Sequence, residues 1–347
     1  MPNVGKSTIF NALVKAKKAA AENYPFCTID PNVGVVEVPD PRLDKIAELE
    51  KSEKITPAAI QFVDIAGLVA GAHKGEGLGN QFLSHIREVD AIALVLRYFL
   101  DPNVIHVAGK IDPEEDYKII LIELIMADLQ TLSKKIAAEE GLTKSGDKES
   151  AKKLEIYKKI EAALNQEKPA KEVVDALDKP ERDLIRDLQL LTAKPIIPVA
   201  NISDDMIGKE ILLFGKPIIA ISAKTETELA ELSGDEQKEF IASIGLTESG
   251  FDKLIREGYK ILGLITFLTG GPKEARAWTV RAGAKAPEAA GKIHTDFEKK
   301  FIAADVIAYD DFVKCGNWVK AREAGLVRLE GKEYIFRDGD VVIFRHG

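Results

Sequence analysis

Residues 2–8, Pro2-Asn3-Val4-Gly5-Lys6-Ser7-Thr8, are the stretch that decides the fold. They match the second half of the phosphate-binding pattern G-x-x-x-x-G-K-[ST], in which glycine lets backbone N–H groups approach phosphate oxygens. Lys6 can reach the β and γ phosphates, and the hydroxyl of Ser7 can coordinate Mg²⁺. The apolar run at residues 9–14 suits a helix whose N-terminus points its positive dipole at the phosphates. The stretch therefore predicts a P-loop nucleotide-binding domain.

The chain begins inside this motif. The first glycine of the pattern and the strand that feeds the loop do not precede Met1. That strand is central and buried on both faces in sheets of this kind. We therefore expect an N-terminus truncated within the P-loop, and a weakened nucleotide site in a chain that starts here.

Length and composition bound the remaining possibilities. The 347 residues predict two or three domains at roughly 100–200 residues each. The formal net charge of −8 disfavours indiscriminate binding to phosphate backbones, although a local basic patch remains compatible with it. Two cysteines, Cys27 and Cys315, cannot form a disulfide framework, which favours a reducing, cytoplasmic location. No apolar run approaches the roughly 18 residues of a membrane span, so we expect no membrane partner.

Asp64 follows a second candidate strand. The apolar run at residues 59–63 leads into Asp64-Ile65-Ala66-Gly67. An aspartate at the carboxyl end of a parallel strand can hold Mg²⁺, and the N–H of Gly67 can meet the γ-phosphate. An ordinary strand-to-turn D-x-x-G would explain the same residues if they stood alone.

Two more motifs follow apolar runs further along the chain. Residues 196–200 end at Asn201-Ile202-Ser203-Asp204, and residues 217–221 end at Ser222-Ala223-Lys224. A GTPase places its two base-recognition segments, N-K-x-D and S-A-K, in this order. Ligands of parallel α/β sheets bind beyond the carboxyl ends of the strands. Four motifs in the right order therefore make chance a poor explanation.

The sequence resembles the Obg-like ATPase family, the YchF branch of the Obg-related P-loop GTPases. The resemblance covers nearly the whole chain and is carried by residues 2–8, 23–28 (N-Y-P-F-C-T), 64–80, 291–298 and 338–341. It implies an α/β P-loop NTPase domain with a mostly parallel, doubly wound sheet, an inserted α-helical hairpin and a C-terminal β-grasp (TGS) domain. By the same resemblance about ten residues precede Met1 in other members.

The family pattern also implies roles for single residues. Thr28 is similar to the switch I threonine that would complete a Mg²⁺ site with Ser7 and Asp64, and Mg²⁺ prefers such oxygen ligands. The glycine-rich run 67–79 resembles switch II, a segment that reorders around the γ-phosphate. The expected nucleotide-binding residues are Asn3, Val4, Gly5, Lys6, Ser7, Thr8, Gly67, Asn201, Ile202, Asp204, Ser222 and Ala223.

Leu68 stands where many GTPases carry the glutamine that orients the attacking water. Leucine cannot do this. His106 matches the histidine to which the family pattern gives that role, so Lys6 and His106 are the expected catalytic residues; His73 is a weaker candidate. A neutral imidazole can hydrogen-bond a water molecule, but a structural role for His106 stays open.

The choice of base is open between adenine and guanine. A guanine site uses its aspartate to accept from N1–H and the 2-amino group, and adenine offers neither donor. The family typically carries N-x-x-E and prefers ATP, which favours ATP here. Asp204, however, is the shorter acid of guanine sites. GTP therefore remains an alternative.

The rest of the chain predicts two further modules. Ile122, Ile125, Leu129, Leu132 and Ile136 recur at 3-4-3-4 spacing, which predicts one arm of a helical hairpin. The expected domains are 1–116 with 191–263 (nucleotide-binding), 117–190 (hairpin) and 264–347 (TGS).

Basic residues are frequent in the C-terminal module. They include Lys285, Lys292, His294, Lys299, Lys300, Lys314, Lys320, Arg322 and Arg328. Such residues can meet the phosphates of RNA or the ribosome, or can simply form a solvated surface with the acids between them. The resemblance implies Mg²⁺-dependent ATP hydrolysis in a nucleotide-gated switch that binds the ribosome or RNA through the TGS domain and the hairpin. The alternatives are a guanine-specific translation GTPase and a nucleotide-gated binding module with negligible hydrolysis.

Overall fold

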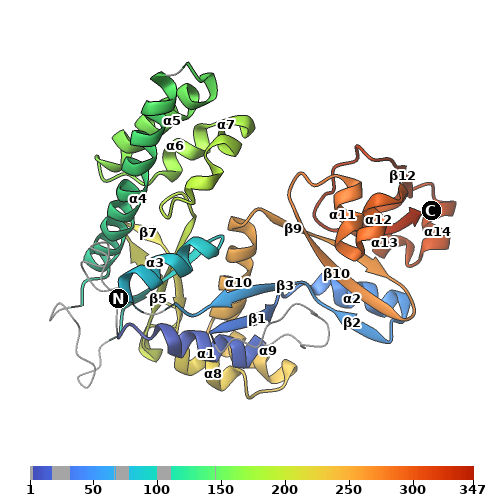
Figure 1. Ribbon diagram of the computed structural model, residues 1–347. Helices are drawn as coiled ribbons and strands as arrows, with labels where there is room; N and C mark the ends of the chain where they lie inside the picture. The colour runs from blue at the N-terminus through green and yellow to red at the C-terminus, as the bar shows by residue number, and fades with distance from the viewer. Residues whose placement is uncertain (1–2, 18–31, 66, 68–77, 100–110, 145) are drawn as a thin grey trace. The chain divides into compact units, whose positions relative to one another are not determined.

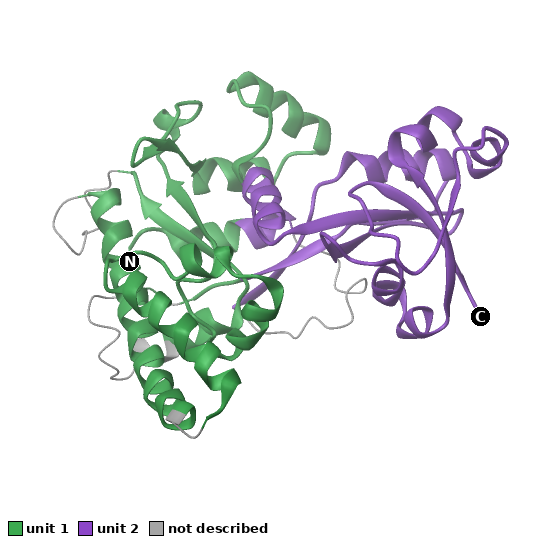
Figure 2. Ribbon diagram, turned by 90° about the horizontal axis from the view of Figure 1, so that it is seen from above, with its two compact units in different colours: residues 1–12, 63–250 green, residues 13–62, 251–347 purple. Residues whose placement is uncertain are grey.

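The computed structural model of the protein describes residues 3–17, 32–65, 67, 78–99, 111–144 and 146–347. These residues form two compact units, residues 1–12 with 63–250 and residues 13–62 with 251–347 (Figure 2). Among them, no helix is long and apolar enough to cross a membrane.

The first unit is built on a parallel sheet. Its strands are β4 (Ile92–Arg97), β5 (Ile196–Asn201) and β8 (Ile219–Ile221), in the order β4-β5-β8. Buried apolar side chains of β4 pack against α3 (Leu78–Glu88) and the first part of α4 (Pro113–Lys144). Because the strands are parallel, Arg97, Asn201 and Ile221 end at one edge of the sheet. The predicted α/β architecture with parallel strands is confirmed.

Several shorter elements complete this unit. They are α5 (Lys148–Leu164), α6 (Lys171–Ala176), α7 (Lys179–Leu184), η3 (Arg186–Leu188), η4 (Asp204–Met206), β6 (Leu212–Leu213), β7 (Lys216–Pro217), α8 (Ala223–Leu229) and α9 (Gly234–Ser243).

Helices α4 and α5 form a long helical pair (green in Figure 1). Ile125 and Leu132 of α4 pack with Ile156 and Ile160 of α5 in one buried cluster. Ile122, predicted in the same stripe, is 43% exposed. The reason is that α4 begins by packing its neighbours Ile120 and Leu124 against the sheet, which turns Ile122 outward.

A buried carboxylate on α4, that of Asp128, links this helix to the segment that precedes β5. Asp128 on α4 accepts hydrogen bonds from the backbone N–H groups of Leu191 and Thr192, each at 2.8 Å, and from the Thr192 hydroxyl at 2.7 Å. Burial raises the pKa of Asp128, and these hydrogen bonds oppose the rise. The chain returning toward β5 is therefore tied to α4 by directional bonds, since a buried carboxylate is costly when unpaired.

The second unit is built on a six-stranded sheet in the order β12-β11-β13-β9-β10-β2. Its strands are β2 (Lys54–Thr56), β9 (Leu264–Gly270), β10 (Glu274–Arg281), β11 (Phe301–Ala308), β12 (Arg328–Glu330) and β13 (Asp340–His346). The other elements are β1 (Val33–Glu37) paired with β3 (Ala59–Val63), α2 (Pro41–Glu50), α10 (Gly250–Ile261), α11 (Ala286–Ile293), α12 (Thr295–Lys299), α13 (Tyr309–Cys315) and α14 (Trp318–Glu323). Phe267, Val306 and Ala289 lie in the core between sheet and α11.

Residues 33–62 belong to this second unit, although the sequence predicted that they would be part of the nucleotide-binding domain. Of their strands, β2 joins the six-stranded sheet, whereas β1 and β3 pair with each other. Strand β2 pairs in parallel with β10, with Ile55 opposite Ala275. The Thr56 hydroxyl donates to Glu274 at 2.6 Å, and the Ser52 hydroxyl donates to the Gly271 carbonyl at 2.7 Å. The segment from residue 32 to residue 62 is thus part of the second unit.

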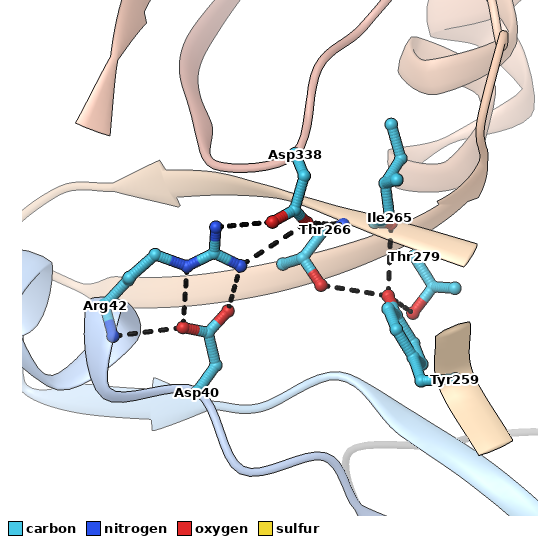
Figure 3. Close-up of polar contacts among 7 residues, drawn as sticks. All are labelled: Asp40, Arg42, Tyr259, Ile265, Thr266, Thr279 and Asp338. Atoms are coloured by element: carbon cyan, nitrogen blue, oxygen red, sulfur yellow. Dashed lines mark hydrogen bonds and ion pairs between the residues drawn. The ribbon is translucent and has the colours of Figure 1, made fainter. Parts of the chain in front are cut away.

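Arg42 at the start of α2 makes the most extended polar contact of this segment (Figure 3). Its guanidinium donates to Asp40 at 2.9 and 2.8 Å and to Asp338 at 2.7 Å. Asp338 also accepts from the backbone N–H of Thr266 at 2.8 Å. The hydrogen bond to Asp40 raises the pKa of Arg42. Charge-assisted forks of this kind fix geometry as well as adding stability.

Tyr259 on α10 lies beside the same strand (Figure 3). Its hydroxyl is 3.1 Å from the Ile265 carbonyl, 2.9 Å from the Thr266 hydroxyl and 3.1 Å from that of Thr279. Burial raises the pKa of Tyr259, so the phenol stays protonated and keeps its donor.

Candidate functional site

The P-loop turns sharply before α1 (Lys6–Lys17). Gly5 has φ +82°, a left-handed conformation that favours glycine. A Cβ added there would lie 2.1 Å from Nδ2 of Asn201. Helix α1 begins directly after it, with the Ile9 N–H donating to the Gly5 carbonyl at 2.9 Å. Position 5 therefore strongly favours glycine, both by its backbone conformation and by the closeness of Asn201.

Asn201, the last residue of β5, is hydrogen-bonded to the P-loop. Its buried side-chain Nδ2 donates to the Val4 carbonyl at 3.0 Å. The predicted P-loop and the first base-recognition residue are therefore in direct contact. Ile202, which follows, is buried and its N–H donates to the Ile221 carbonyl at 2.9 Å.

Lys6 and Asp64 face each other at the phosphate end. Lys6 Nζ is 3.7 Å from Asp64 Oδ1, and the two side chains are 30% and 16% exposed. This Asp64 oxygen is buried and accepts no hydrogen bond from the residues that the structure describes. Apart from the long ion pair with Lys6, this buried carboxylate oxygen lacks the hydrogen bond that would offset its loss of water.

A magnesium ion fits this demand. Mg²⁺ is a hard cation that usually binds proteins through one or two oxygen ligands and the phosphates of its nucleotide. Asp64 offers a carboxylate oxygen that accepts no hydrogen bond from the described residues, and Ser7, in the first turn of α1, offers an exposed hydroxyl. These residues would hold the ion.

Asp204 lies at the base end and is already engaged. Its Oδ1 accepts from the Ser222 hydroxyl at 2.6 Å and from the Thr225 hydroxyl at 2.9 Å. Its Oδ2 accepts from Lys224 Nζ at 2.8 Å. The hydrogen bond from Lys224, followed in importance by the one from Ser222, lowers the pKa of Asp204 to about 2. The carboxylate is therefore charged at neutral pH and bound within the chain.

The S-A-K segment is positioned by the start of α8. Ser222 is the N-cap of that helix and its hydroxyl accepts from the Thr225 N–H at 3.3 Å. Ser222, Ala223 and Thr225 are all buried. The two predicted base-recognition segments are therefore in direct contact through Asp204 and Ser222.

The remaining predicted site residues either are at least partly exposed or lie outside the residues that the structure describes. Thr28, His106 and the alternative His73 lie outside the described residues. Asn3 is exposed on the loop, Ser7 and Thr8 are exposed in the first turn of α1, and Gly67 is half-buried.

Sequence reasoning missed two residues beside the P-loop. Arg97 ends β4 in register with Asn201 and is buried. Its Nε donates to the Phe99 carbonyl at 3.1 Å, and its guanidinium carbon lies 4.5 Å from the centre of the Phe99 ring. A Cβ at Gly5 would come within 3.9 Å of that ring. The sequence signal for this site was Arg97 itself, a charged residue at the end of an otherwise apolar strand.

Comparisons with known proteins agree with this geometry. Residues 1–138 match the family MMR_HSR1, described as 50S ribosome-binding GTPase, and residues 264–347 match YchF-GTPase_C, described as a protein of unknown function (DUF933).

Full-length relatives cover almost the whole chain. The ribosome-binding ATPase YchF of Bacillus subtilis is 50% identical over 357 residues, covering 99% of this chain and 97% of the relative. That of Escherichia coli O157:H7 is 48% identical over 355 residues, covering 99% and 96%. The structure of the Schizosaccharomyces pombe YchF GTPase matches with a TM-score of 0.88 at 36% identity, covering 99% of this chain and 96% of that one.

Proposed function

Because the chain belongs to the YchF family of P-loop NTPases, we propose that it is a ribosome-binding ATPase that hydrolyses ATP to ADP and phosphate with Mg²⁺. Relatives that are about half identical carry the name ribosome-binding ATPase. The single observation on which the proposal rests is the Lys6–Asp64 pair, whose buried carboxylate oxygen lacks a hydrogen-bond partner.

The chain's own residues would divide the work. Lys6 would neutralise charge on the β and γ phosphates, and Gly5 would let backbone N–H groups approach them. Ser7, Asp64 and Thr28 would hold Mg²⁺, which when bound screens the charge that develops on the phosphate oxygens. Asn201, through its bond to the Val4 carbonyl, would keep the loop in its binding shape.

Water activation would differ from that of many GTPases. Leu68 offers no polar group, so turnover of the protein alone should be slow. We propose His106 as the group that positions water. Replacing His106 with alanine tests this, because a structural histidine would leave the rate per folded molecule unchanged.

Ribosome or RNA binding would involve the C-terminal unit and the helical pair α4–α5. Several of the predicted basic residues form ion pairs within the chain: Arg322 pairs with Asp305, Lys285 with Glu333, and Lys314 with Asp311. Four of the lysines predicted from the sequence are exposed and form no ion pair with described residues: Lys292, Lys299, Lys300 and Lys320. These are the candidates for phosphate contact. Activity on ribosomes would take place in the cytoplasm.

Phosphate release with Mg·ATP, with and without ribosomes, tests the proposal. Lys6→Ala should lower turnover by about 100-fold or more, because it removes a charge that stabilises the transition state. The matched control is Lys45→Ala, since Lys45 is an exposed lysine whose partner is Glu48 on its own helix.

Turnover that Lys6→Ala leaves intact would rule out this site. Nucleotide-dependent ribosome binding without measurable turnover would instead support the binding module, and a preference for GTP would support a GTPase.

A further inference from the structure

The two purine bases make opposite demands on an aspartate at the base end. Guanine presents two donors, N1–H and the 2-amino group, and a carboxylate pairs with both through its two oxygens. Adenine has neither donor at these positions. A free carboxylate facing adenine would lose its hydration without gaining partners, which is unfavourable for a charged group.

Asp204 avoids this cost because neighbouring residues of the chain already donate hydrogen bonds to it. An ionised carboxylate has about four acceptor sites, two on each oxygen. Ser222 and Thr225 take both sites on Oδ1, and Lys224 takes one on Oδ2. Only one site is left, which cannot match both guanine donors through two oxygens.

The Oδ1 contacts are the firmer part of this arrangement. Ser222 and Thr225 are buried and belong to the capped first turn of α8. Lys224 is 71% exposed and Asp204 is 42% exposed, so their ion pair is screened by water and weaker. Lys224 is the largest cause of the lowered pKa of Asp204, but its side chain is exposed and that of Thr225 is buried. Thr225 should therefore contribute more to the occupancy of Asp204 than Lys224 does.

We propose that Thr225, assisted by Lys224, determines base specificity by saturating Asp204, so that adenine is accepted without an unpaired carboxylate and guanine finds too few acceptors. Asp204 then faces the base without binding it, because its hydrogen bonds are made to residues of the chain. This inference deepens the proposed ATPase function and rests on it. It also explains how an N-x-x-D sequence that resembles a guanine site serves adenine.

The chain offers a matched set of variants. Thr225→Val keeps the shape of the side chain and removes its hydroxyl. Thr227→Val makes the same change in the same helix, but the Thr227 hydroxyl donates to the Ala223 carbonyl at 2.7 Å and does not reach Asp204. Lys224→Ala removes an exposed side chain and should fold normally.

Calorimetric titration of ADP and GDP into each full-length protein tests the proposal. The wild type should bind ADP more tightly. Thr225→Val should raise the GDP affinity relative to ADP by about 10-fold, roughly the effect of one hydrogen bond to a charged group. Lys224→Ala should raise it by a smaller factor, and Thr227→Val should leave the ratio at the wild-type value.

Two outcomes separate failure of this inference from failure of the proposed function. An unchanged ADP-to-GDP ratio in both Thr225→Val and Lys224→Ala, with ADP still preferred, would overturn the inference alone. A wild type that prefers GDP would overturn the ATPase assignment and the inference together. If Thr225→Val does not fold, the Lys224→Ala ratio decides the matter.

Discussion

The phosphate end and the base end of the candidate nucleotide site differ in how far their carboxylates are satisfied. Asp64 Oδ1 is buried, accepts no hydrogen bond from the described residues and lies 3.7 Å from Lys6 Nζ. Asp204, at the other end, accepts three hydrogen bonds from Ser222, Thr225 and Lys224. One end of the site is incomplete without a ligand, and the other is complete without one.

This difference separates affinity from specificity. A buried, unpaired carboxylate oxygen is stabilised when a cation arrives, so binding energy should come mainly from the phosphate end. Asp204 already accepts three hydrogen bonds within the chain, so it gains little from a nucleotide base. The base end should therefore select adenine by failing to pair with the donors of guanine. The two ends can therefore be tested by substitutions that leave side-chain shape unchanged.

The largest effect is expected at Asp64. Asp64→Asn keeps the shape of the side chain but removes the charge that would hold Mg²⁺. Turnover should fall by a factor on the order of 100 or more, because both metal positioning and charge stabilisation are lost. Steady-state phosphate release at saturating ATP measures this. A variant that hydrolyses ATP at the wild-type rate would show that Asp64 is only a structural partner of Lys6.

Asn201 lies between the two ends, and its replacement should affect both bases alike. Asn201→Asp removes the Nδ2–H donor to the Val4 carbonyl and places a carboxylate there instead. Because the group is buried, the unfolding free energy should fall by about 1–3 kcal/mol. ADP and GDP affinities should fall together, by about 10-fold for a loss of 1.4 kcal/mol.

Chemical denaturation and calorimetry measure the two consequences at Asn201. A selective loss of ADP binding, with GDP binding unchanged, would move adenine recognition from the Asp204 cluster to Asn201.

The smallest effect is expected at Lys224, and it appears in the pH dependence. The fold lowers the pKa of Asp204 to about 2, with Lys224 as the largest cause. A folded-state pKa below the unfolded one means that the stabilisation is present above about pH 4 and is lost as the pH falls toward 2. Lys224→Ala should move the Asp204 pKa up toward its ordinary value. An NMR titration of the Asp204 carboxyl carbon measures this, and an unchanged midpoint would mean that Ser222 and Thr225 hold the charge alone.

The motifs at the sheet edge were predictable because parallel strands impose their arrangement. Residues that end strands β4, β5 and β8 must meet at one edge, so the proximity of Asn201 to the P-loop followed from chain order. The glycine at position 5 followed for a similar reason, since the loop needs a positive φ that side chains rarely adopt.

Contacts between distant residues were not predictable. Strand β2 has three residues, too few to show an alternating pattern, and its partner β10 lies about 220 residues away in the chain. Thr225 looks like an ordinary helix residue in the sequence. Its bond to Asp204 exists because the short helix η4 brings Asp204 to the first turn of α8.

The most direct test of the contrast between the two ends is a Mg²⁺ titration of nucleotide binding in the wild type, Asp64→Asn and Thr225→Val. For each protein the affinities for ADP and GDP are measured across the Mg²⁺ range. Asp64→Asn should lose the Mg²⁺ dependence and keep the preference for ADP, whereas Thr225→Val should keep the Mg²⁺ dependence and lose much of the preference. Substitutions that each changed both properties, or neither, would contradict the division between a phosphate end that binds and a base end that selects.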